Sequence, residues 1–416
     1  MPETISAPSR FHYGWVILIM ATMTVFGALG LARFSYSVVL PAMQENLLLD
    51  NTETGMLATF NLVGYLIFSA VGGALATRYG SRKVIAVGLA LSGVGLWMTG
   101  TVSGVGWGAV WCALTGIGSG VSNMSVMGLL SVWFASSKRG MAAGIAVTGT
   151  SYAMILVGTL VPELMEFFDQ DGWRVCWFVL GVICLILALA ALLLLRNHPA
   201  EKSVYPIGGN SIESPSHELP GKNSLELSRV YRSGKVWLLG GIYIAFGFSY
   251  IIYVTFFVLY LVNEGNYSQE DASGLYMLIG WVSIFCGVVW GSVSDQIGRG
   301  RAMFLVYLLQ AASFGLFGLW QSPTGFIISA LLFGITAWSI PAIMAAACGD
   351  VLEPRMTSAA LGFITIFFGV GQSLGPLVAG LIADYMHSLS PVFLVASITA
   401  MAGAFGSLAL EEKHRF

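Results

Sequence analysis

One arginine lies inside the first long apolar segment of the chain, in the stretch GALGLARFSYSVVLPAM at residues 27–43. The guanidinium of this residue, Arg33, stays charged at any working pH, and its planar fork matches a carboxylate or a phosphate. An arginine at bilayer depth costs about 2.5–3.5 kcal/mol, so it normally faces a polar cavity or an oppositely charged partner. Arg33 is therefore the first candidate for binding chemistry in this sequence.

The apolar segments supply no counter-ion for Arg33. None of the 21 acidic residues lies well inside one of them: Glu45 and Glu163 lie near outer ends, and Asp295 and Asp350 near inner ends. The histidines lie outside as well. The natural counter-ion is then a ligand. The alternative is that Arg33 extends outward to the lipid headgroups, with its aliphatic part covering apolar surface.

The composition indicates a membrane protein with many helices. Of the 416 residues, 56% are hydrophobic and 10% are charged, whereas a soluble globular protein carries about 25% charged residues. Twelve apolar segments are each near or above the roughly 20 residues that cross a bilayer as a helix. They lie at roughly 14–42, 54–76, 83–101, 106–134, 140–162, 174–195, 236–262, 272–294, 302–320, 324–347, 357–381 and 390–410. The sequence predicts an all-α membrane protein with twelve transmembrane helices.

The distribution of Lys and Arg predicts the orientation of these helices. With the N-terminus in the cytoplasm, every Lys and Arg except Arg33 and Arg174 falls on the inner side, as the positive-inside rule requires. We therefore expect a multi-pass protein of the cell inner membrane with both termini in the cytoplasm. The first segment is far longer than the apolar part of a signal peptide, so we expect it to remain as the first helix. Arg174, beside Trp173, is expected to anchor its helix at the interface.

The sequence offers no sign of catalysis. The five cysteines lie in or beside apolar segments, so we expect buried apolar thiols rather than disulfides or metal ligands. No His/Cys/Asp cluster, nucleophile–base pair or nucleotide-binding loop is visible. We expect neither an enzyme nor a metal or cofactor, and no nucleic-acid partner.

A polar stretch rich in Pro, Gly and Ser divides the chain. Residues 196–235 predict a cytoplasmic linker between an N-terminal six-helix bundle at 1–195 and a C-terminal six-helix bundle at 236–416. A flexible connector and a regulatory segment both remain open for the linker. A similar glycine-rich, charged stretch occurs at the same place in both halves. GALATRYGSRKV at 73–84 and GSVSDQIGRGRA at 291–302 each follow the second apolar segment of their half. Such parallel repeats are typical of many transporters.

These two stretches resemble the loop signature of the major facilitator superfamily, G-x-L-(A/S)-D-R-x-G-R-(R/K). Thr77 replaces the usual Asp in the first copy, and Gln296 replaces the usual Arg in the second. The resemblance implies that these loops form a conformational latch, which holds the outward-open state through charge pairing. The residues assigned to this latch are Gly73, Arg78, Gly80, Arg82, Gly291, Asp295, Gly298 and Arg299.

Two branches of the superfamily are similar to this chain. YGWVIL at 13–18, DGWR at 171–174 and GVGQSLGPLVAG at 369–380 look like bacterial monocarboxylate and oxalate–formate transporters. LARFSYSVVLPAMQ with FGFSYIIYVTF looks like a poorly characterised bacterial group, and the two branches stay open. A drug exporter is disfavoured, because the fourth segment has no arginine and the fifth has no Gly-Pro pair.

The spacing of Arg33 and Pro41 resembles that of glycerol phosphate transporters of the superfamily, which carry a substrate-binding arginine eight residues before a proline. Those transporters have a second arginine in the seventh helix, where AFGFSYIIYVTFF at 245–257 has none. One guanidinium suits a single carboxylate, whereas a phosphate dianion favours two. This comparison favours a monocarboxylate.

Further cavity-lining candidates follow from helical spacing. Tyr36 and Ser37 share the face of Arg33, and an aromatic face recurs along residues 243–253. Packing explains an aromatic stripe equally well, and small polar residues also hold membrane helices together. The predicted substrate-binding set is Arg33, Tyr36, Ser37, Asn123, Tyr250, Tyr253 and Gln372.

The sequence thus predicts a secondary transporter that moves a small organic anion by alternating access, with a monomeric functional unit in the lipid bilayer. A non-transporting sensor or scaffold with the same fold, and an exporter of an uncharged or drug-like solute, are the alternatives. The spans offer no Asp, Glu or His that could carry a coupled proton. Anion exchange or facilitated diffusion is therefore favoured over proton symport.

Overall fold

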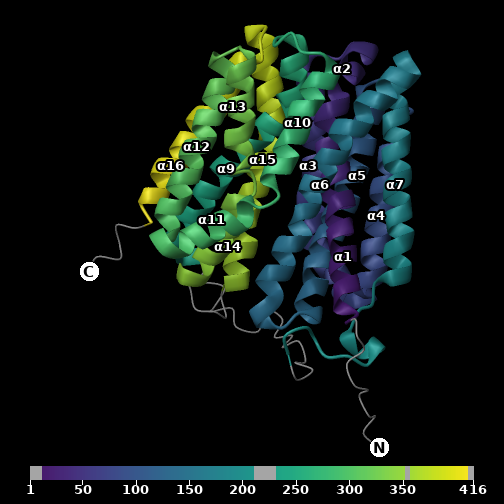
Figure 1. Ribbon diagram of the computed structural model, residues 1–416, viewed down its shortest axis with the longest axis vertical. Coiled ribbons are helices and arrows are strands. Elements are labelled where there is room, and N and C mark those ends of the chain that lie inside the picture. The colour runs from purple at the N-terminus through teal and green to yellow at the C-terminus, as the bar shows by residue number, and fades with distance from the viewer. Residues whose placement is uncertain (1–11, 210–230, 352–356, 411–416) are drawn as a thin grey trace, which may run out of the picture. The chain divides into compact units, whose positions relative to one another are not determined.

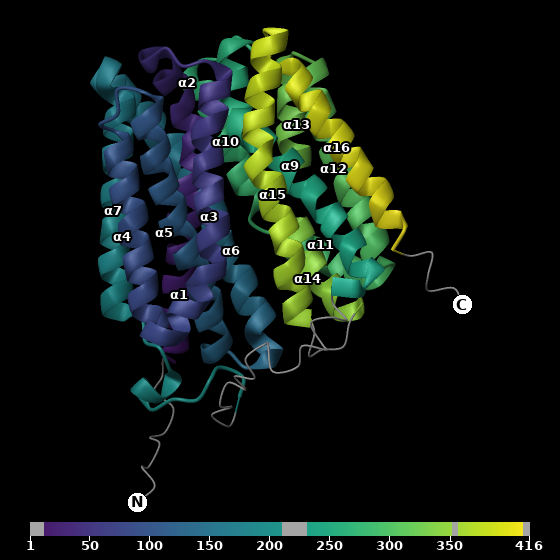
Figure 2. The same cartoon turned by 180° about the vertical axis from the view of Figure 1, so that it is seen from behind.

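The computed structural model describes residues 12–209, 231–351 and 357–410. Figures 1 and 2 show its helices from opposite sides. No strand occurs among these residues, and one isolated bridge pairs Phe134 with Ile207. The helices are α1 (Gly14–Val25), the π-helix η1 (Phe26–Phe34), α2 (Ser35–Leu47), α3 (Asn51–Tyr79), α4 (Ser81–Thr99), α5 (Val105–Trp133), α6 (Ser136–Phe168), α7 (Gly172–Leu194), α9 (Gly234–Asn263), α10 (Gln269–Ser283), α11 (Cys286–Ile297), α12 (Arg299–Leu319), α13 (Pro323–Gly334), α14 (Ser339–Val351), α15 (Thr357–Met386) and α16 (Ser390–Leu408), with short 3₁₀ turns η2 (Asp169–Asp171) and η3 (Pro199–Lys202).

The number of membrane crossings agrees with the sequence prediction. In the described part of the chain, ten helical segments are long and apolar enough to cross a membrane, and the bent pair α10 and α11 makes an eleventh. One of the ten, Ser137–Leu194, contains both α6 and α7 and so crosses twice. The predicted all-α membrane protein with twelve transmembrane helices is confirmed.

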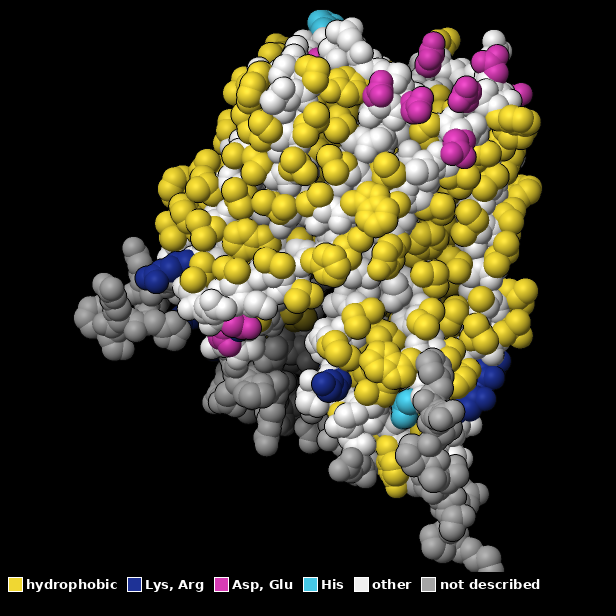
Figure 3. All heavy atoms as spheres, viewed as in Figure 1, with side chains coloured by type: hydrophobic (Ala, Val, Ile, Leu, Met, Phe, Trp, Pro, Cys, Tyr) yellow, Lys and Arg dark blue, Asp and Glu magenta, His cyan; other side chains and the backbone are white. Residues whose placement is uncertain are grey.

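The outer surfaces of the helices match a lipid environment. On α7, Ile186, Leu189 and Leu193 are each more than half exposed. Figure 3 shows hydrophobic side chains covering much of the surface over the middle of the helices. In the first half of the chain, η2 with its two aspartates precedes α7, and Arg196 follows it. Both chain ends, residues 1–11 and 411–416, lie outside the described residues.

The chain divides into two compact units. The first comprises Met1–Ser35, Val63–Met154 and Leu164–His217, and the second comprises Tyr36–Leu62, Ile155–Glu163 and Glu218–Phe416. Short pieces of three helices from the N-terminal half therefore group with the C-terminal half. The two units are defined by packing and not by the order of the chain. The six-helix bundles predicted at 1–195 and 236–416 therefore stay a prediction. Of the predicted linker, residues 196–209 are described and residues 210–230 are not.

Small residues bring the helices of the first unit into close contact. A Cβ at Gly118 of α5 would lie 2.3 Å from the Gly88 carbonyl oxygen and 2.5 Å from the Ser92 nitrogen, both on α4. Backbones can approach this closely only where side chains are absent, which is how membrane helices commonly associate. Around this contact, the buried core includes Leu89, Val126 and Trp133.

The first membrane helix is not a regular α-helix. The nine residues of η1 form π turns, which the continuous apolar segment at 14–42 did not predict. π turns are typical of functional sites, and they leave carbonyl groups without their usual helical donors. Side chains of two neighbouring helices supply donors here: the Ser119 hydroxyl donates to the Ala28 carbonyl, and the Cys184 thiol approaches the Gly27 carbonyl at 3.8 Å. Arg33 lies in the last turn of this π segment.

Two helices of the second unit are broken side by side. The α10/α11 pair bends by 45°, and α13 ends before α14 begins at Ser339. Pro341 in the first turn of α14 has no N–H to continue the helix, which explains the second break. The breaks are joined by two hydrogen bonds: the Trp290 indole N–H donates to the Ile335 carbonyl at 2.8 Å, and the Trp338 amide donates to the Cys286 sulfur at 3.3 Å.

One carboxylate holds the start of α3 within the second unit. The Asp384 side chain on α15 accepts hydrogen bonds from the backbone and side chain of Asn51 and of Thr52, at 2.5–3.0 Å. An acidic group at a helix N-terminus is favourable, because it pairs with free amides and with the helix dipole. The backbones also lie close together here, since a Cβ at Gly55 would lie 2.1 Å from the Pro376 carbonyl oxygen.

Candidate functional site

Arg33 lies over an aromatic ring in the first unit. Its guanidinium carbon is 4.4 Å from the centroid of the Tyr65 ring of α3, which is a cation–π distance. This contact occupies one face of the guanidinium. The Nε and Nη2 atoms of Arg33 are buried and have no hydrogen-bond partner among the described residues.

These two nitrogens form one edge of the guanidinium. Their N–H groups point in the same direction, so the edge matches the two oxygens of one carboxylate through a bidentate pair of charge-assisted hydrogen bonds. A buried donor without a partner costs about 1–3 kcal/mol, and more when it is charged. The unpaired edge of Arg33 has the geometry and charge to accept both oxygens of a carboxylate.

Asn123 extends the same site from α5. Its amide nitrogen donates to the Tyr65 hydroxyl at 3.0 Å, while its Oδ1 atom is buried without a partner in the described residues. The approach of α3 and α5 explains this contact: a Cβ at Gly64 would lie 2.5 Å from the Ala113 carbonyl oxygen, and a Cβ at Gly120 would lie 2.5 Å from that of Tyr65. We name Arg33, Tyr65 and Asn123 the arginine site.

Tyr65 was missed by sequence reasoning. The second apolar segment contains it in the stretch NLVGYLIF at 61–68, where the preceding Gly64 is the only local sign of a close helix contact. A single sequence does not reveal that this tyrosine lies beneath a guanidinium from another helix.

The remaining candidates from the N-terminal half belong to the second unit. The Tyr36 hydroxyl donates to the Thr54 carbonyl of α3 at 2.8 Å, so it stabilises the contact between α2 and α3. Ser37 is 1% exposed, and its hydroxyl has no hydrogen-bond partner among the described residues.

The aromatic face predicted on α9 has two different environments. Tyr250 stacks on Phe246, with ring centroids 4.7 Å apart, and the Gln372 amide of α15 donates to its hydroxyl. Phe368 of α15, which the sequence analysis did not include, stacks with the same rings. Tyr253 instead is fully buried in the core of the second unit, where its hydroxyl bonds to Ser329 Oγ at 2.7 Å.

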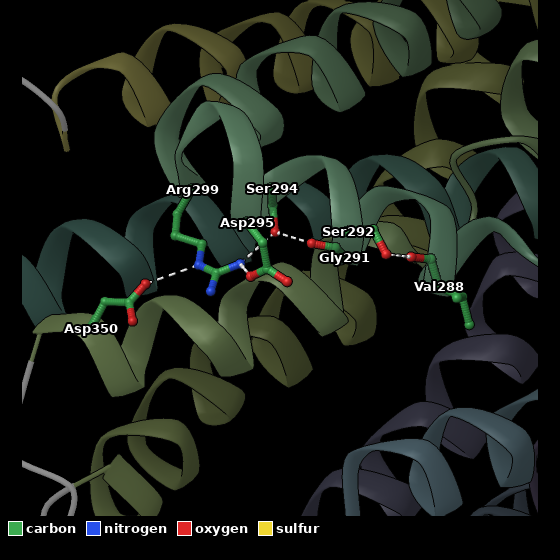
Figure 4. Close-up of polar contacts among 7 residues, drawn as sticks. All are labelled: Val288, Gly291, Ser292, Ser294, Asp295, Arg299 and Asp350. Atoms are coloured by element: carbon green, nitrogen blue, oxygen red, sulfur yellow. Dashed lines mark hydrogen bonds and ion pairs between the residues drawn. The ribbon is translucent and has the colours of Figure 1, made fainter.

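The second copy of the loop signature forms a charged network (Figure 4). Arg299, at the start of α12, contacts Asp295 of α11 at 2.5 Å and donates from Nε to Asp350 of α14 at 2.9 Å. Its Nη1 also donates to the Ser294 hydroxyl at 2.6 Å. Gly298 precedes Arg299 with φ 95°, a left-handed conformation that glycine adopts readily. The three charged residues thus connect the ends of three helices.

The first copy is built differently. Thr77 donates its hydroxyl to the Gly73 carbonyl at 3.0 Å, and the Arg82 Nε donates to the Leu192 carbonyl at 2.6 Å. The Arg78 guanidinium lies 5.2 Å from the Tyr79 ring centroid. Gly80, like Gly298, has a left-handed backbone with φ 85°. In the first copy, the arginines therefore contact a backbone carbonyl and an aromatic ring, whereas Arg299 in the second copy contacts two carboxylates.

We expect Arg299→Gln to lower the thermal stability of the folded protein by about 1 kcal/mol, since exposed ion pairs contribute roughly 0.2–1 kcal/mol each. Asp295→Asn and Asp350→Asn should each give part of this loss. Thermal unfolding in detergent, followed by tryptophan fluorescence, measures it. Lys235→Gln, which removes a partly exposed charge at the start of α9, is the control and should have no effect. Equal stability of Arg299→Gln and Lys235→Gln would contradict the network.

The chain thus combines twelve membrane-crossing helices, an arginine whose Nε–Nη2 edge is buried and unpaired among the described residues, and a repeated loop signature. These features define a polytopic membrane transporter. The sequence model of the Major Facilitator Superfamily matches residues 22–319 and 271–415. These matches cover most of the chain, which therefore belongs to the Major Facilitator Superfamily, a family of transporters and not of enzymes.

Relatives and solved structures agree with this assignment. The chain is 25% identical over 396 residues to the hexuronate transporter of Bacillus subtilis, covering 91% of this chain and 90% of that protein. It is 26% identical over 427 residues to the mouse monocarboxylate transporter 11, covering 96% and 88%. Among solved structures, a bacterial homologue of the human lysosomal transporter Spinster, inward-facing and occupied, has a TM-score of 0.75 at 14% identity, covering 97% and 98%.

Proposed function

We propose that this transporter moves a small organic anion with one carboxylate by alternating access, and that Arg33 binds the carboxylate. The observation that carries the proposal is the buried, unpaired Nε–Nη2 edge of Arg33. Buried donors without partners are unfavourable, and a ligand that supplies two acceptors removes this cost. A role for Arg33 in packing alone would leave that cost without compensation.

A monocarboxylate fits better than a phosphate dianion. The arginine site contains a single guanidinium, and α9 carries no arginine, its only cation being Lys235 at the start. Two relatives support a carboxylate ligand, because the hexuronate transporter and monocarboxylate transporter 11 are both named for solutes that carry this group.

The proposal includes further contacts and the latch. Asn123 adds a polar group to the arginine site, and Ser37, Tyr250 and Gln372 of the second unit stay predicted substrate-binding residues. The loop signature residues, with the Arg299 network among them, act as the conformational latch that the family resemblance implies. We further propose an inner-membrane location with both termini in the cytoplasm, in line with the distribution of Lys and Arg. We also propose a monomer as the functional unit.

Uptake of labelled monocarboxylates into proteoliposomes tests the function directly. The wild-type protein should accumulate at least one labelled monocarboxylate above the level of empty liposomes, and excess unlabelled substrate should compete. A folded protein that moves none of a broad carboxylate panel would contradict the proposal and favour a sensor or scaffold.

The coupling mechanism gives a separate prediction. No carboxylate or imidazole of the described residues forms an ion pair with Arg33, so we expect exchange of one anion for another, each neutralising the guanidinium in turn. Vesicles preloaded with unlabelled substrate should then take up labelled substrate much faster than empty vesicles, with or without a pH gradient. Strong uptake into empty vesicles driven by the pH gradient would refute exchange.

A further inference from the structure

The arginine site contains a second unsatisfied group besides the guanidinium edge. Asn123 is 5% exposed, and its Oδ1 atom has no hydrogen-bond partner in the described part of the chain. Its amide nitrogen is already used by the Tyr65 hydroxyl. A role in holding helices together is therefore fulfilled by the nitrogen alone, and the oxygen remains as a buried acceptor that costs about 1–3 kcal/mol when left unpaired.

Tyr65 fixes the distance between the two unsatisfied groups. The guanidinium of Arg33 lies over the face of its ring, and Asn123 bonds to the hydroxyl at the end of the same ring. The Arg33 guanidinium and the Asn123 amide thus contact the same tyrosine side chain, which brings the unpaired guanidinium edge and the unpaired acceptor together around one ring. A single small molecule can reach both.

The charge of the arginine site decides which donor suits Asn123. An ammonium group on the substrate would add a second positive charge beside Arg33, and like charges at short range in a poorly solvated site repel each other. A substrate without any donor would leave Oδ1 unpaired. A hydroxyl satisfies the acceptor and carries no charge.

We propose that the substrate is a hydroxycarboxylate, whose carboxylate binds the Nε–Nη2 edge of Arg33 and whose hydroxyl donates to Asn123 Oδ1. This inference rests on the proposed function and adds the substrate class and the residue that selects it. Sites that hydrogen-bond a substrate hydroxyl discriminate strongly against the analogue that lacks it, because the buried partner is then left unpaired.

Matched substrate pairs test the inference in proteoliposomes: lactate against propionate and glycolate against acetate, with alanine as the ammonium analogue. For the wild-type protein we expect competition by the hydroxylated acid to be about tenfold stronger than by its partner, and no competition by alanine. In Asn123→Leu the two members of each pair should compete equally, because the acceptor for the substrate hydroxyl is gone. Ser125→Ala removes another buried hydroxyl from α5, one that donates to the Gly72 carbonyl, and should keep the wild-type ratio.

The outcomes separate this inference from the proposed function. A wild-type ratio near one, or a ratio that survives in Asn123→Leu, would overturn the hydroxyl contact while leaving anion transport intact. Loss of both members of each pair in Arg33→Gln supports the carboxylate contact independently of Asn123. A wild-type protein that binds no carboxylate of the panel would overturn both.

Discussion

Transport by Arg33→Gln should fall by roughly two orders of magnitude or more, because removing one partner of a buried charge-assisted pair costs about 2–5 kcal/mol. Arg33→Lys keeps the charge but loses the fork, so it should also be strongly impaired. Uptake kinetics in proteoliposomes measure both effects. Lys202→Gln is a matched control, since it removes an exposed cation that lies 4.8 Å from the Tyr13 ring centroid, and it should transport normally.

Stability separates a binding role from a packing role for Arg33. In the absence of substrate, the two buried N–H donors of Arg33 have no partner among the described residues, which costs free energy. Arg33→Gln removes this cost and should unfold at no lower temperature than the wild-type protein. Substrate should raise the unfolding temperature of the wild-type protein only, because a ligand stabilises the state that binds it. An Arg33→Gln protein that is destabilised yet still transports at the wild-type rate would contradict the binding role.

Gly118→Ala should strongly reduce the yield and the stability of the folded protein. The new Cβ would lie 2.3–2.6 Å from the Gly88 oxygen and from the nitrogen and hydroxyl of Ser92, so α4 and α5 would have to separate. Overpacking of this kind costs about 1–3 kcal/mol. The amount of monodisperse protein after solubilisation and its thermal unfolding temperature measure the effect.

Gly128→Ala is the matched control for this prediction. It lies on the same helix, and its added Cβ would have no neighbour within 4 Å. Alanine is the better helix former by roughly 0.5–1 kcal/mol, so the control should be neutral or slightly stabilising. Identical behaviour of the two variants would exclude the α4–α5 contact as a determinant of the fold.

Hydropathy and the distribution of charge were sufficient to predict the twelve helices, because each helix must be long and apolar by itself to cross the bilayer. The sequence also singled out Arg33 and Asn123, since a polar side chain at membrane depth requires a reason, and their role in binding stays a prediction. The sequence did not predict that both residues contact Tyr65. That contact depends on the close approach of α3 and α5 at Gly64 and Gly120.

Other features could not be predicted because they depend on contacts between residues that are far apart in the sequence. Asp384 lies just beyond a predicted segment, and its role depends on Asn51 and Thr52 at the start of α3. The break between α10 and α11 has no proline, and it lies beside the break that Pro341 explains. Tyr253 and Tyr250 share one face of α9 and are both buried, yet Tyr253 bonds to Ser329 while Tyr250 bonds to Gln372, which depends on the neighbouring helices.

The two breaks, between α10 and α11 and between α13 and α14, are points where the helices of the second unit can bend. The α11 segment has 12 residues, so it is roughly 18 Å long. A change of 10° in its bend would displace its far end by roughly 3 Å at that length, about the width of a water molecule. Because Arg299 ties Asp295 on α11 to Asp350 on α14, the same rotation would carry both segments as one arm. A small adjustment at residues 284–285 and 335–338 would therefore be amplified toward the far ends of both segments.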